Sequence, residues 1–292
     1  DGNNDSDDIS FELNSFVGGG THIYAYPNSS LTQHSNWSFW ANAHTGGSGA
    51  IYLKQASGIS ILSALINDCT SGISLDQCSG ELEIARCNIY AKTNGINIAN
   101  SSFSASSTPQ ILNNLVKMSG ANIYNPNYDS DAYGIVVNGG SNLFLAHNSI
   151  DNKSRTSASA ALYLSGSNLV AKNNMMVASG YGVALYLYSV SNALVEHNNL
   201  YAHYLNLAKI GNNYYTTLAE FASVAGGTNY SINPLLNSQL QTLSPWLDNL
   251  GLPCGVTNDY GNLLRDPNTP DIGAHEYNSD PSLSPLSGTL TV

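Results

Sequence analysis

The chain has 292 residues and a formal net charge of −11, with 9 Lys and Arg against 20 Asp and Glu. Only 10% of the residues are charged and 42% are hydrophobic, so the composition is not that of a disordered protein and a sizeable core can form. The basic residues are few and scattered, which excludes nucleic acid as a partner and disfavours anionic membrane surfaces. No apolar run approaches the roughly 20 residues that cross a bilayer, so membrane insertion is not expected.

The N-terminal segment is acidic and polar. Its first residues, DGNNDSDD, resemble neither a signal peptide nor a usual translation start, which favours a chain that is processed or excised from something longer. Asp1, Asn3, Asp5 and Asp7 place oxygen-bearing side chains at alternate positions, a spacing that suits a cation such as Ca²⁺.

From about residue 50 onward, two short strand patterns recur. In the first, a small residue precedes an apolar, a variable and an apolar position, which predicts a half-buried strand after a tight turn. It occupies residues 50–53, 72–75, 95–98, 134–137, 161–164 and 184–187. In the second, apolar residues flank a fixed position, at residues 61–66, 84–89, 111–116, 145–150, 171–176, 195–200 and 210–215. Because one coil cannot bury its inner face alone, two recurring strands per coil predict a solenoid of stacked parallel strands.

The fixed position of the second pattern is asparagine in five of its seven occurrences. The column reads Ala64, Cys87, Asn114, Asn148, Asn174, Asn198 and Asn213. An amide at a bend can accept a hydrogen bond from one coil and donate one to the next, so an internal asparagine ladder is expected. We predict that Asn148 and Asn174 point inward. Longer gaps place insertions at residues 117–133 and 152–159, where solenoids commonly build their binding faces.

After the coils, a short helical turn is expected at residues 217–221. The tail then carries SPWLDNLG at 244–251, DYGNLLR at 259–265 and PDIGAHE at 270–276. The asparagine-centred coils resemble right-handed parallel β-helix repeats of the pectate-lyase-like superfamily. The tail resembles the end of bacterial extracellular β-helix proteins of the choice-of-anchor type.

This resemblance implies an all-β, right-handed parallel β-helix with a C-terminal cap, in a secreted or surface-displayed bacterial protein. Such a chain is usually a monomeric module linked to others. We assign residues 1–215 to the β-helix and residues 216–280 to the capping region. Residues 281–292 have linker composition or begin a further, truncated module.

Exposed tyrosines suggest a carbohydrate site. Tyr52, Tyr163 and Tyr186 occupy the outward position of the first pattern, and Tyr188 follows two residues after Tyr186. On neighbouring coils about 4.8 Å apart, such rings form a flat patch that suits the apolar faces of sugars. The alternative is that tyrosine simply fills exposed strand positions well.

Charged residues in neighbouring coils allow a catalytic interpretation or a structural one. Lys172 and Glu196 share one column, and Lys117 and Asp151 share another; each pair is either a base with its carboxylate partner or an ion pair between coils. We favour the ion pairs.

Two further sets of polar residues receive a structural interpretation. His147 and His197 belong to a polar row that is expected at the surface, with Asn113, Asn173 and Asn212. Arg265, Asp271 and Glu276 lie in the tail motif, and we interpret them as structural.

The longest insertion carries candidate metal ligands. Asn127, Asp129 and Asp131 alternate along residues 125–131, a spacing that can aim several oxygens at one Ca²⁺ ion. Solvated loop residues are the alternative interpretation.

Three functions remain open from the sequence. The favoured one is an extracellular or cell-surface module that binds a polysaccharide or glycan surface through the tyrosines and the 117–133 insertion. The second is a polysaccharide lyase or glycoside hydrolase, for which no catalytic residue can be assigned. The third is a structural spacer within an adhesin. Because arginines and lysines are scattered, no depolymerisation of uronic-acid polymers is expected.

Overall fold

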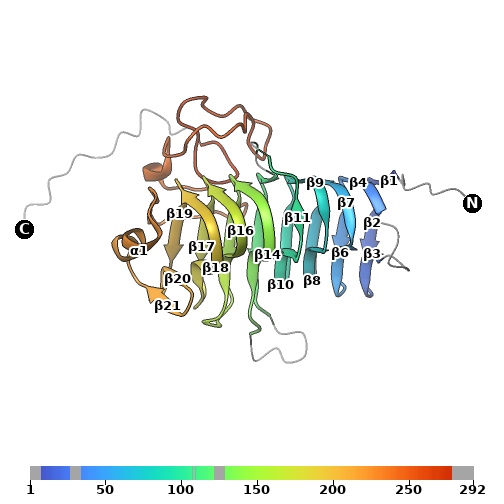
Figure 1. Cartoon of the computed structure of the whole chain (residues 1–292), viewed down its shortest axis with the longest axis horizontal. Helices are drawn as coiled ribbons and strands as arrows, with labels where there is room; N and C mark the ends of the chain where they lie inside the picture. The colour runs from blue at the N-terminus through green and yellow to red at the C-terminus, as the bar shows by residue number, and fades with distance from the viewer. Residues whose placement is uncertain (1–7, 27–33, 107, 109, 122–128, 278–292) are drawn as a thin grey trace, which may run out of the picture.

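The computed structural model describes residues 8–26, 34–106, 108, 110–121 and 129–277, and it shows a parallel β-helix of about eight turns (Figure 1). Successive coils stack along the long axis, and each coil contributes strands to three parallel sheets. Every strand pairing described between coils is parallel, and one antiparallel hairpin ends the stack. The all-β solenoid predicted from the recurring strand patterns is therefore confirmed.

The strands divide among the three sheets as follows. The first sheet contains β1 (Ile9–Glu12), β4 (His34–Trp40), β7 (Ala56–Leu62), β9 (Ser79–Ala85), β11 (Ser102–Phe103), β12 (Ile111–Leu112) and the second halves of β14 (Tyr133–Ala146), β16 (Ala160–Lys172) and β18 (Val183–Glu196). The second sheet contains β2 (Ser15–Val17), β5 (Ala43–Thr45), β13 (Leu115–Met118), β15 (Ser149–Asn152), β17 (Met175–Ala178), β19 (Asn199–Ala202) and the first parts of β8 (Leu65–Asp76) and β10 (Asn88–Ala99). The third sheet contains β3 (Thr21–Ala25), β6 (Gly49–Lys54), β20 (Ala208–Ile210), β21 (Asn213–Tyr215) and the remaining parts of β8, β10, β14, β16 and β18.

Apolar side chains fill the bore because alternate residues of each strand point inward. One inward column of the third sheet is in register over six coils: Ile51, Ile73, Ile96, Ile135, Leu162 and Leu185. All six are at most 1% exposed, and burying each side chain stabilises the fold by about 1.5–3 kcal/mol. The small residue before these strands also has a steric cause. A Cβ on Gly95 would lie 2.4 Å from the carbonyl oxygen of Gly134.

The asparagine ladder is formed as predicted, with Asn148 and Asn174 buried and pointing inward. Asn148 Nδ2 donates to Asn174 Oδ1 at 2.9 Å, and Asn174 Nδ2 donates to Asn198 Oδ1 at 3.0 Å. The backbone N–H of each also donates to the same oxygen of the next coil. Each Nδ2 reaches a carbonyl of a preceding coil as well, Ile111 in the case of Asn148. One side chain thereby links three coils.

The end of the ladder differs from the prediction. Asn213 is exposed in β21, which pairs antiparallel with β20, and Asn229 takes the ladder position instead by accepting from Asn198 at 3.1 Å. The physical reason is length: the interval from Asn198 to Asn213 is too short for a full coil, so the chain turns back in a hairpin. At the other end, Asn42 occupies the same column and accepts from Asn14.

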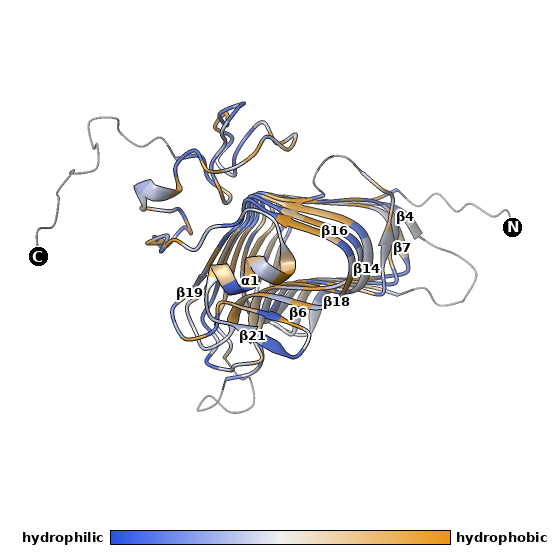
Figure 2. Ribbon diagram, turned by 60° about the vertical axis from the view of Figure 1, so that its left-hand side comes forward, coloured by the Kyte–Doolittle hydropathy of each residue, from blue (hydrophilic) through white to orange (hydrophobic). Residues whose placement is uncertain are grey.

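A helix closes the C-terminal end of the bore. The predicted helical turn is the start of α1 (Leu218–Ala225), which begins with a capping box formed by Thr217 and Glu220. Phe221 is fully buried in the main core, and α1 lies over the open end of the coils (Figure 2). The last coil is thus shielded from pairing with another strand.

The chain then returns along the outside of the solenoid to residue 277 (Figure 1). This return segment, residues 228–277, contains the single turn η1 (Pro245–Leu247) and follows the corner between the first and second sheets. Asn173 exchanges hydrogen bonds with the backbone of Leu252, and Asn113 Nδ2 donates to the carbonyl of Asn258 at 2.8 Å.

The polar row predicted at the surface is therefore covered in part, and that prediction is wrong. His147 is 0% exposed and its Nδ1 lies 3.0 Å from the carbonyl oxygen of Asp271. Arg265 is also buried: it pairs with Glu276 at 3.0 Å and donates to Asn113 Oδ1 at 2.9 Å. These contacts agree with a structural role for the charges of the tail motif. The final segment, residues 281–292, lies outside the described residues.

Candidate functional site

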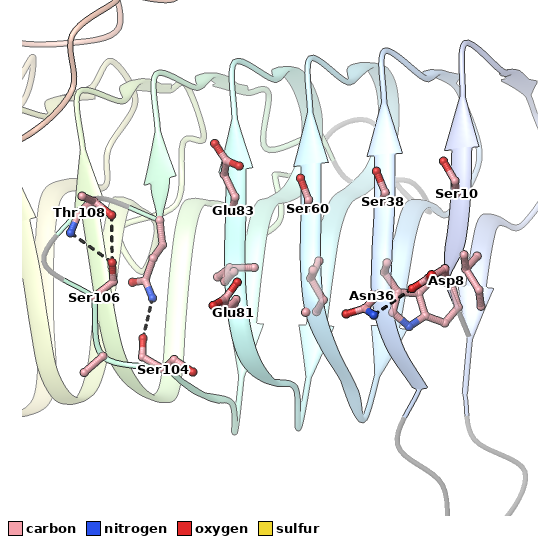
Figure 3. Close-up of a pocket in the computed structure, with 17 residues that line it drawn as sticks. Asp8, Ser10, Asn36, Ser38, Ser60, Glu81, Glu83, Ser104, Ser106 and Thr108 are labelled. Carbon is pink, nitrogen blue, oxygen red and sulfur yellow. Dashed lines mark hydrogen bonds between the residues drawn. The ribbon is translucent and has the colours of Figure 1, made fainter. Parts of the chain in front are cut away.

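A groove of about 790 Å³ lies on the outer face of the first sheet, near the N-terminal end, and extends over β1, β4, β7 and β9 to the coil that follows β9. We call it the first-sheet groove. Its described lining comprises Asp8, Ile9, Ser10, Asn36, Trp37, Ser38, Gly58, Ile59, Ser60, Glu81, Leu82, Glu83, Ser104, Ala105, Ser106, Thr108 and Gln110. The groove runs across the strands and so along the axis of the solenoid (Figure 3).

A row of polar side chains runs along the groove. Ser10, Ser38, Ser60 and Glu83 are in direct register on β1, β4, β7 and β9, and their side chains project from the same face (Figure 3). Parallel pairing places consecutive members about 4.8 Å apart, so the row spans about 14 Å. The result is a periodic line of hydroxyl groups that ends in a carboxylate.

A second polar row lies beside the first. Asn36 Nδ2 donates to Asp8 Oδ1 at 2.9 Å, and Glu81 stands two residues before Glu83 on the exposed side of β9. Between them, Gly58 has a φ of +61°, and a Cβ there would lie 3.0 Å from Asn36 Oδ1. A residue without a side chain keeps this part of the groove open.

The far wall comes from described residues between β11 and β12, namely Ser104, Ala105, Ser106, Thr108 and Gln110. Gln110 holds this wall in place: its Nε2 donates to the carbonyl of Ser104 at 3.2 Å, and its Oε1 accepts the backbone N–H of Phe144 at 2.8 Å. Ser106 and Thr108 share a hydrogen bond of 3.0 Å between their hydroxyls. The wall therefore presents the hydroxyl groups of Ser106 and Thr108 to the groove.

The electrostatic character of the groove is acidic. Its described lining contains the carboxylates of Asp8, Glu81 and Glu83 and no Lys, Arg or His. Hydroxyl, amide and carboxylate groups are hydrogen-bonding partners for neutral sugars, whereas a polyanion would be repelled.

The groove residues were not among the predicted site residues, although the sequence carries a signal for them. The triplets Ile9-Ser10-Phe11, Trp37-Ser38-Phe39 and Ile59-Ser60-Ile61 repeat an apolar, serine, apolar pattern. They lie mostly before the coil repeat that is recognisable from residue 50, so they were not aligned with it.

The predicted tyrosines form two clusters on the third sheet. Tyr163 packs edge-to-face on Tyr186 with centroids 4.9 Å apart, and Tyr188 lies 6.4 Å from Tyr163. Lys209 Nζ lies 4.4 Å from the Tyr186 centroid. Tyr52 belongs to the other cluster, stacked on Tyr24 at 5.0 Å. Ser74, Asn97 and Val136 occupy the same column in the three coils between the clusters.

Only one of the two predicted ion pairs between coils is formed. Lys172 and Glu196 form the expected ion pair, with 2.7 Å between Nζ and Oε1. Lys117 and Asp151 are in register, but Lys117 donates to the carbonyl of Ser238 in the return segment. Asp151 instead accepts from Ser179 and lies 3.6 Å from a neighbouring lysine. The Lys117–Asp151 ion pair is thus replaced by contacts that the return segment and the next coil provide.

The predicted calcium ligands do not come together among the described residues. Asp129 is bound by the guanidinium of Arg155 at 3.0 Å, and these hydrogen bonds hold the pKa of Asp129 below its usual value. Asp131 is exposed. Asn127 and the N-terminal Asp1 to Asp7 lie outside the described residues. The prediction of a Ca²⁺ site finds no support.

Comparison with known proteins identifies the family. Residues 3–233 match the model of the family described as periplasmic copper-binding protein (NosD). The chain belongs to the NosD family. The match covers the β-helix and α1 and stops within the first residues of the return segment. Membership of NosD is consistent with an extracellular or periplasmic β-helix module. No curated protein and no solved structure gave a significant match.

The copper-binding description of NosD can be tested against the side chains. Within the described residues there is no group of three or more His, Cys, Asp or Glu side chains placed to hold a metal ion, and no helix long and apolar enough to cross a membrane. Burial raises the pKa of Cys69 and Cys78 to about 11, so these thiols are protonated. A two-histidine arrangement does fit copper: Nδ1 of His22 lies 3.2 Å from Nδ1 of His44, and imidazole nitrogen is a copper ligand.

Proposed function

We propose that the chain is an extracellular or periplasmic β-helix module that binds a neutral polysaccharide along the first-sheet groove. The observation that carries this proposal is the row of Ser10, Ser38, Ser60 and Glu83, in register across four coils. A polymer lying along the solenoid axis would meet a hydrogen-bonding group once per coil. The absence of cations from the described lining favours uncharged sugars over uronic acids.

The tyrosine cluster of Tyr163, Tyr186 and Tyr188 is proposed as a second sugar contact on another face. Tyr188 is 55% exposed, and its ring offers a flat apolar surface of the kind that packs on a sugar ring. Aromatic rings and hydroxyl rows would then bind different parts of one long chain, which strengthens binding through effective concentration.

The test is affinity electrophoresis of the purified chain in gels that contain neutral glucans, mannans or polygalacturonate. We expect retardation by a neutral polymer and none by polygalacturonate. Ser60→Phe fills the middle of the groove and is expected to weaken binding at least tenfold. Ser191→Phe places the same ring at an exposed position of β18 on a distant coil and serves as the matched control. Equal retardation of both variants would exclude the groove.

Catalysis remains the alternative, and one observation favours a hydrolase over a lyase. Glu81 and Glu83 both face solvent from the same face of one strand, and a pair of carboxylates is what glycoside hydrolysis uses. New reducing ends released from the bound polymer, and lost in Glu83→Gln, would replace the binding proposal with this one.

A further inference from the structure

Two histidines interrupt the apolar bore at its N-terminal end. His44 is 0% exposed and belongs to an inward column that is otherwise apolar in the adjoining coils: Phe16, Ile66, Ile89 and Val116. His22 lies on β3 between Thr21 and Ile23, which pair with residues of β6. The later coils carry only alanine or glycine at the position of His22. A histidine side chain at this position extends toward the first column, and there it meets His44.

The two rings face each other through their Nδ1 atoms. These atoms are 3.2 Å apart, the ring centroids are 5.4 Å apart, and the planes differ by 12°. The centroid separation exceeds the nitrogen separation by about the width of one ring, so both Nδ1 atoms lie close to the line that joins the centroids. Phe16 stacks on His44 at 4.8 Å and on His22 at 5.9 Å. The pair is thus held in place by an aromatic neighbour.

The hydrogen bond to Gly18 defines the tautomer of His22. Its Nε2 lies 3.0 Å from the carbonyl oxygen of Gly18, and a carbonyl only accepts, so Nε2 carries the proton and Nδ1 presents its lone pair. Metal-binding histidines commonly have this arrangement, with the outer nitrogen bonded to a carbonyl. His22 is therefore already oriented as a ligand.

His44 is an expensive residue for a purely structural role. Its Nε2 is buried without a hydrogen-bond partner in the described structure, which costs free energy that an isoleucine or phenylalanine in the same column would not cost. Burial, and then the neighbouring His22, lower the pKa of His44 to about 4. The ring is therefore neutral, as a metal ligand must be.

We infer that His22 and His44 bind one Cu⁺ ion between their Nδ1 atoms, in a two-coordinate site inside the N-terminal coils. This site is separate from the proposed glycan groove and does not depend on it. With metal–nitrogen bonds of about 2.0 Å, the observed spacing suits a bent arrangement, and a linear one needs the rings to separate by less than about 1 Å. His22 can move by that amount because it is half-buried and its partner Gly18 has open space around it.

Copper binding moves the His44 proton from Nδ1 to Nε2, where the N–H still has no partner in the described structure, so the metal–nitrogen bonds must offset the cost of that unpaired donor. The ion replaces the hydrogen bond between the two rings, so the same pair alternates between sharing a proton and sharing a metal ion. Two facing imidazole nitrogens cannot complete the four-coordinate shell that Zn²⁺ prefers in structural sites. The site is accordingly selective for a d¹⁰ monovalent ion.

The experiment titrates the folded chain anaerobically with Cu⁺ against a colorimetric Cu⁺ chelator. Wild type is expected to take up one equivalent that His22→Phe and His44→Phe each weaken at least tenfold. Phenylalanine preserves the stack on Phe16. His203→Phe, at an exposed position, and Cys69→Ser, the buried thiol bound to the Gly46 carbonyl, are expected to retain it. Unchanged affinity in both histidine variants, or loss in Cys69→Ser alone, would overturn the inference.

A second measurement covers the case in which a variant fails to fold. Nitrogen chemical shifts of the histidine rings are recorded in the wild-type chain as redox-inert Ag⁺ is added. The Nδ1 resonances of His22 and His44 are expected to shift together and to saturate at one equivalent. Shifts confined to other histidines, or no shift of either ring, would contradict the site.

Discussion

A single asparagine of the ladder illustrates how much one residue stabilises in this fold. Asn148 Oδ1 accepts from Asn114 through both the backbone N–H and Nδ2, and Asn148 Nδ2 donates to Ile111 and Asn174. All of these groups are buried, so removing the amide leaves several of them without partners.

We predict that Asn148→Leu lowers the free energy of unfolding by about 2–5 kcal/mol, since each unpaired buried group costs about 1–3 kcal/mol. Urea denaturation measures the change. Asn213→Leu, outside the ladder, is the control and is expected to stay within about 0.5 kcal/mol of wild type. If Asn148→Leu lowers the free energy of unfolding no more than Asn213→Leu does, the ladder does not stabilise the fold as predicted.

His147 makes stability depend on pH. Its Nδ1 donates to the carbonyl of Asp271, and its Nε2 accepts from Asn173 Nδ2 at 3.0 Å; a second ring proton would point at that donor. Burial, and then the charge of Arg265, lower the pKa of His147 well below its usual value. The folded state therefore keeps His147 neutral, while the unfolded state gains a proton near pH 6.5.

It follows that the contribution of His147 is fully present above about pH 6.5 and is lost as the pH falls toward the folded pKa. Between pH 7.5 and 5.0 we predict a loss of up to about 2 kcal/mol. Denaturation at both pH values, in wild type and in His147→Gln, isolates this part, because glutamine does not titrate. The same pH dependence in both proteins would show that other groups cause it.

At the scale of elements, the strands of the third sheet carry the tyrosine cluster. Tyr163 on β16 and Tyr186 on β18 are in direct register, so the spacing of parallel strands, and not a loop, holds the rings together. The rings are therefore already in place, and a sugar that bound them would not have to order a flexible segment.

We predict that Tyr163→Ala and Tyr186→Ala each weaken retardation by the bound polysaccharide about two- to tenfold, the range expected for one aromatic contact. Tyr90→Ala is the control, because Tyr90 is 39% exposed but lies on the first part of β10, in the second sheet. If the control variant weakens binding as much as the other two, the cluster has no specific role.

At the scale of the whole molecule, the sequence predicts the repeating coils but not the course of the return segment, residues 228–277. Coil register follows from local patterns of small, apolar and asparagine residues, so the bore and most of the ladder were predictable. The return segment was not, because its contacts join distant residues such as Arg265 and Asn113, and no local periodicity records them. Its course also explains why the row with His147 is buried.

The first-sheet groove was missed for a related reason. Ser10 and Ser38 belong to coils that precede the clear repeat, and the far wall depends on hydrogen bonds that Gln110 makes to Ser104 and Phe144. Site residues that depend on alignment of irregular coils need the three-dimensional register. Tyr163 and Tyr186 were predicted to be neighbours because they lie in regular coils.

The length dependence of oligosaccharide binding tests the central claim most directly. Neutral oligosaccharides of increasing length, taken from the polymer that retards the chain, are titrated by calorimetry. If the groove holds an extended chain along the row from Ser10 to Glu83, affinity rises with length until the sugar spans about 14 Å and then levels off. An affinity that is the same for a monosaccharide and for every longer chain would contradict binding along the groove.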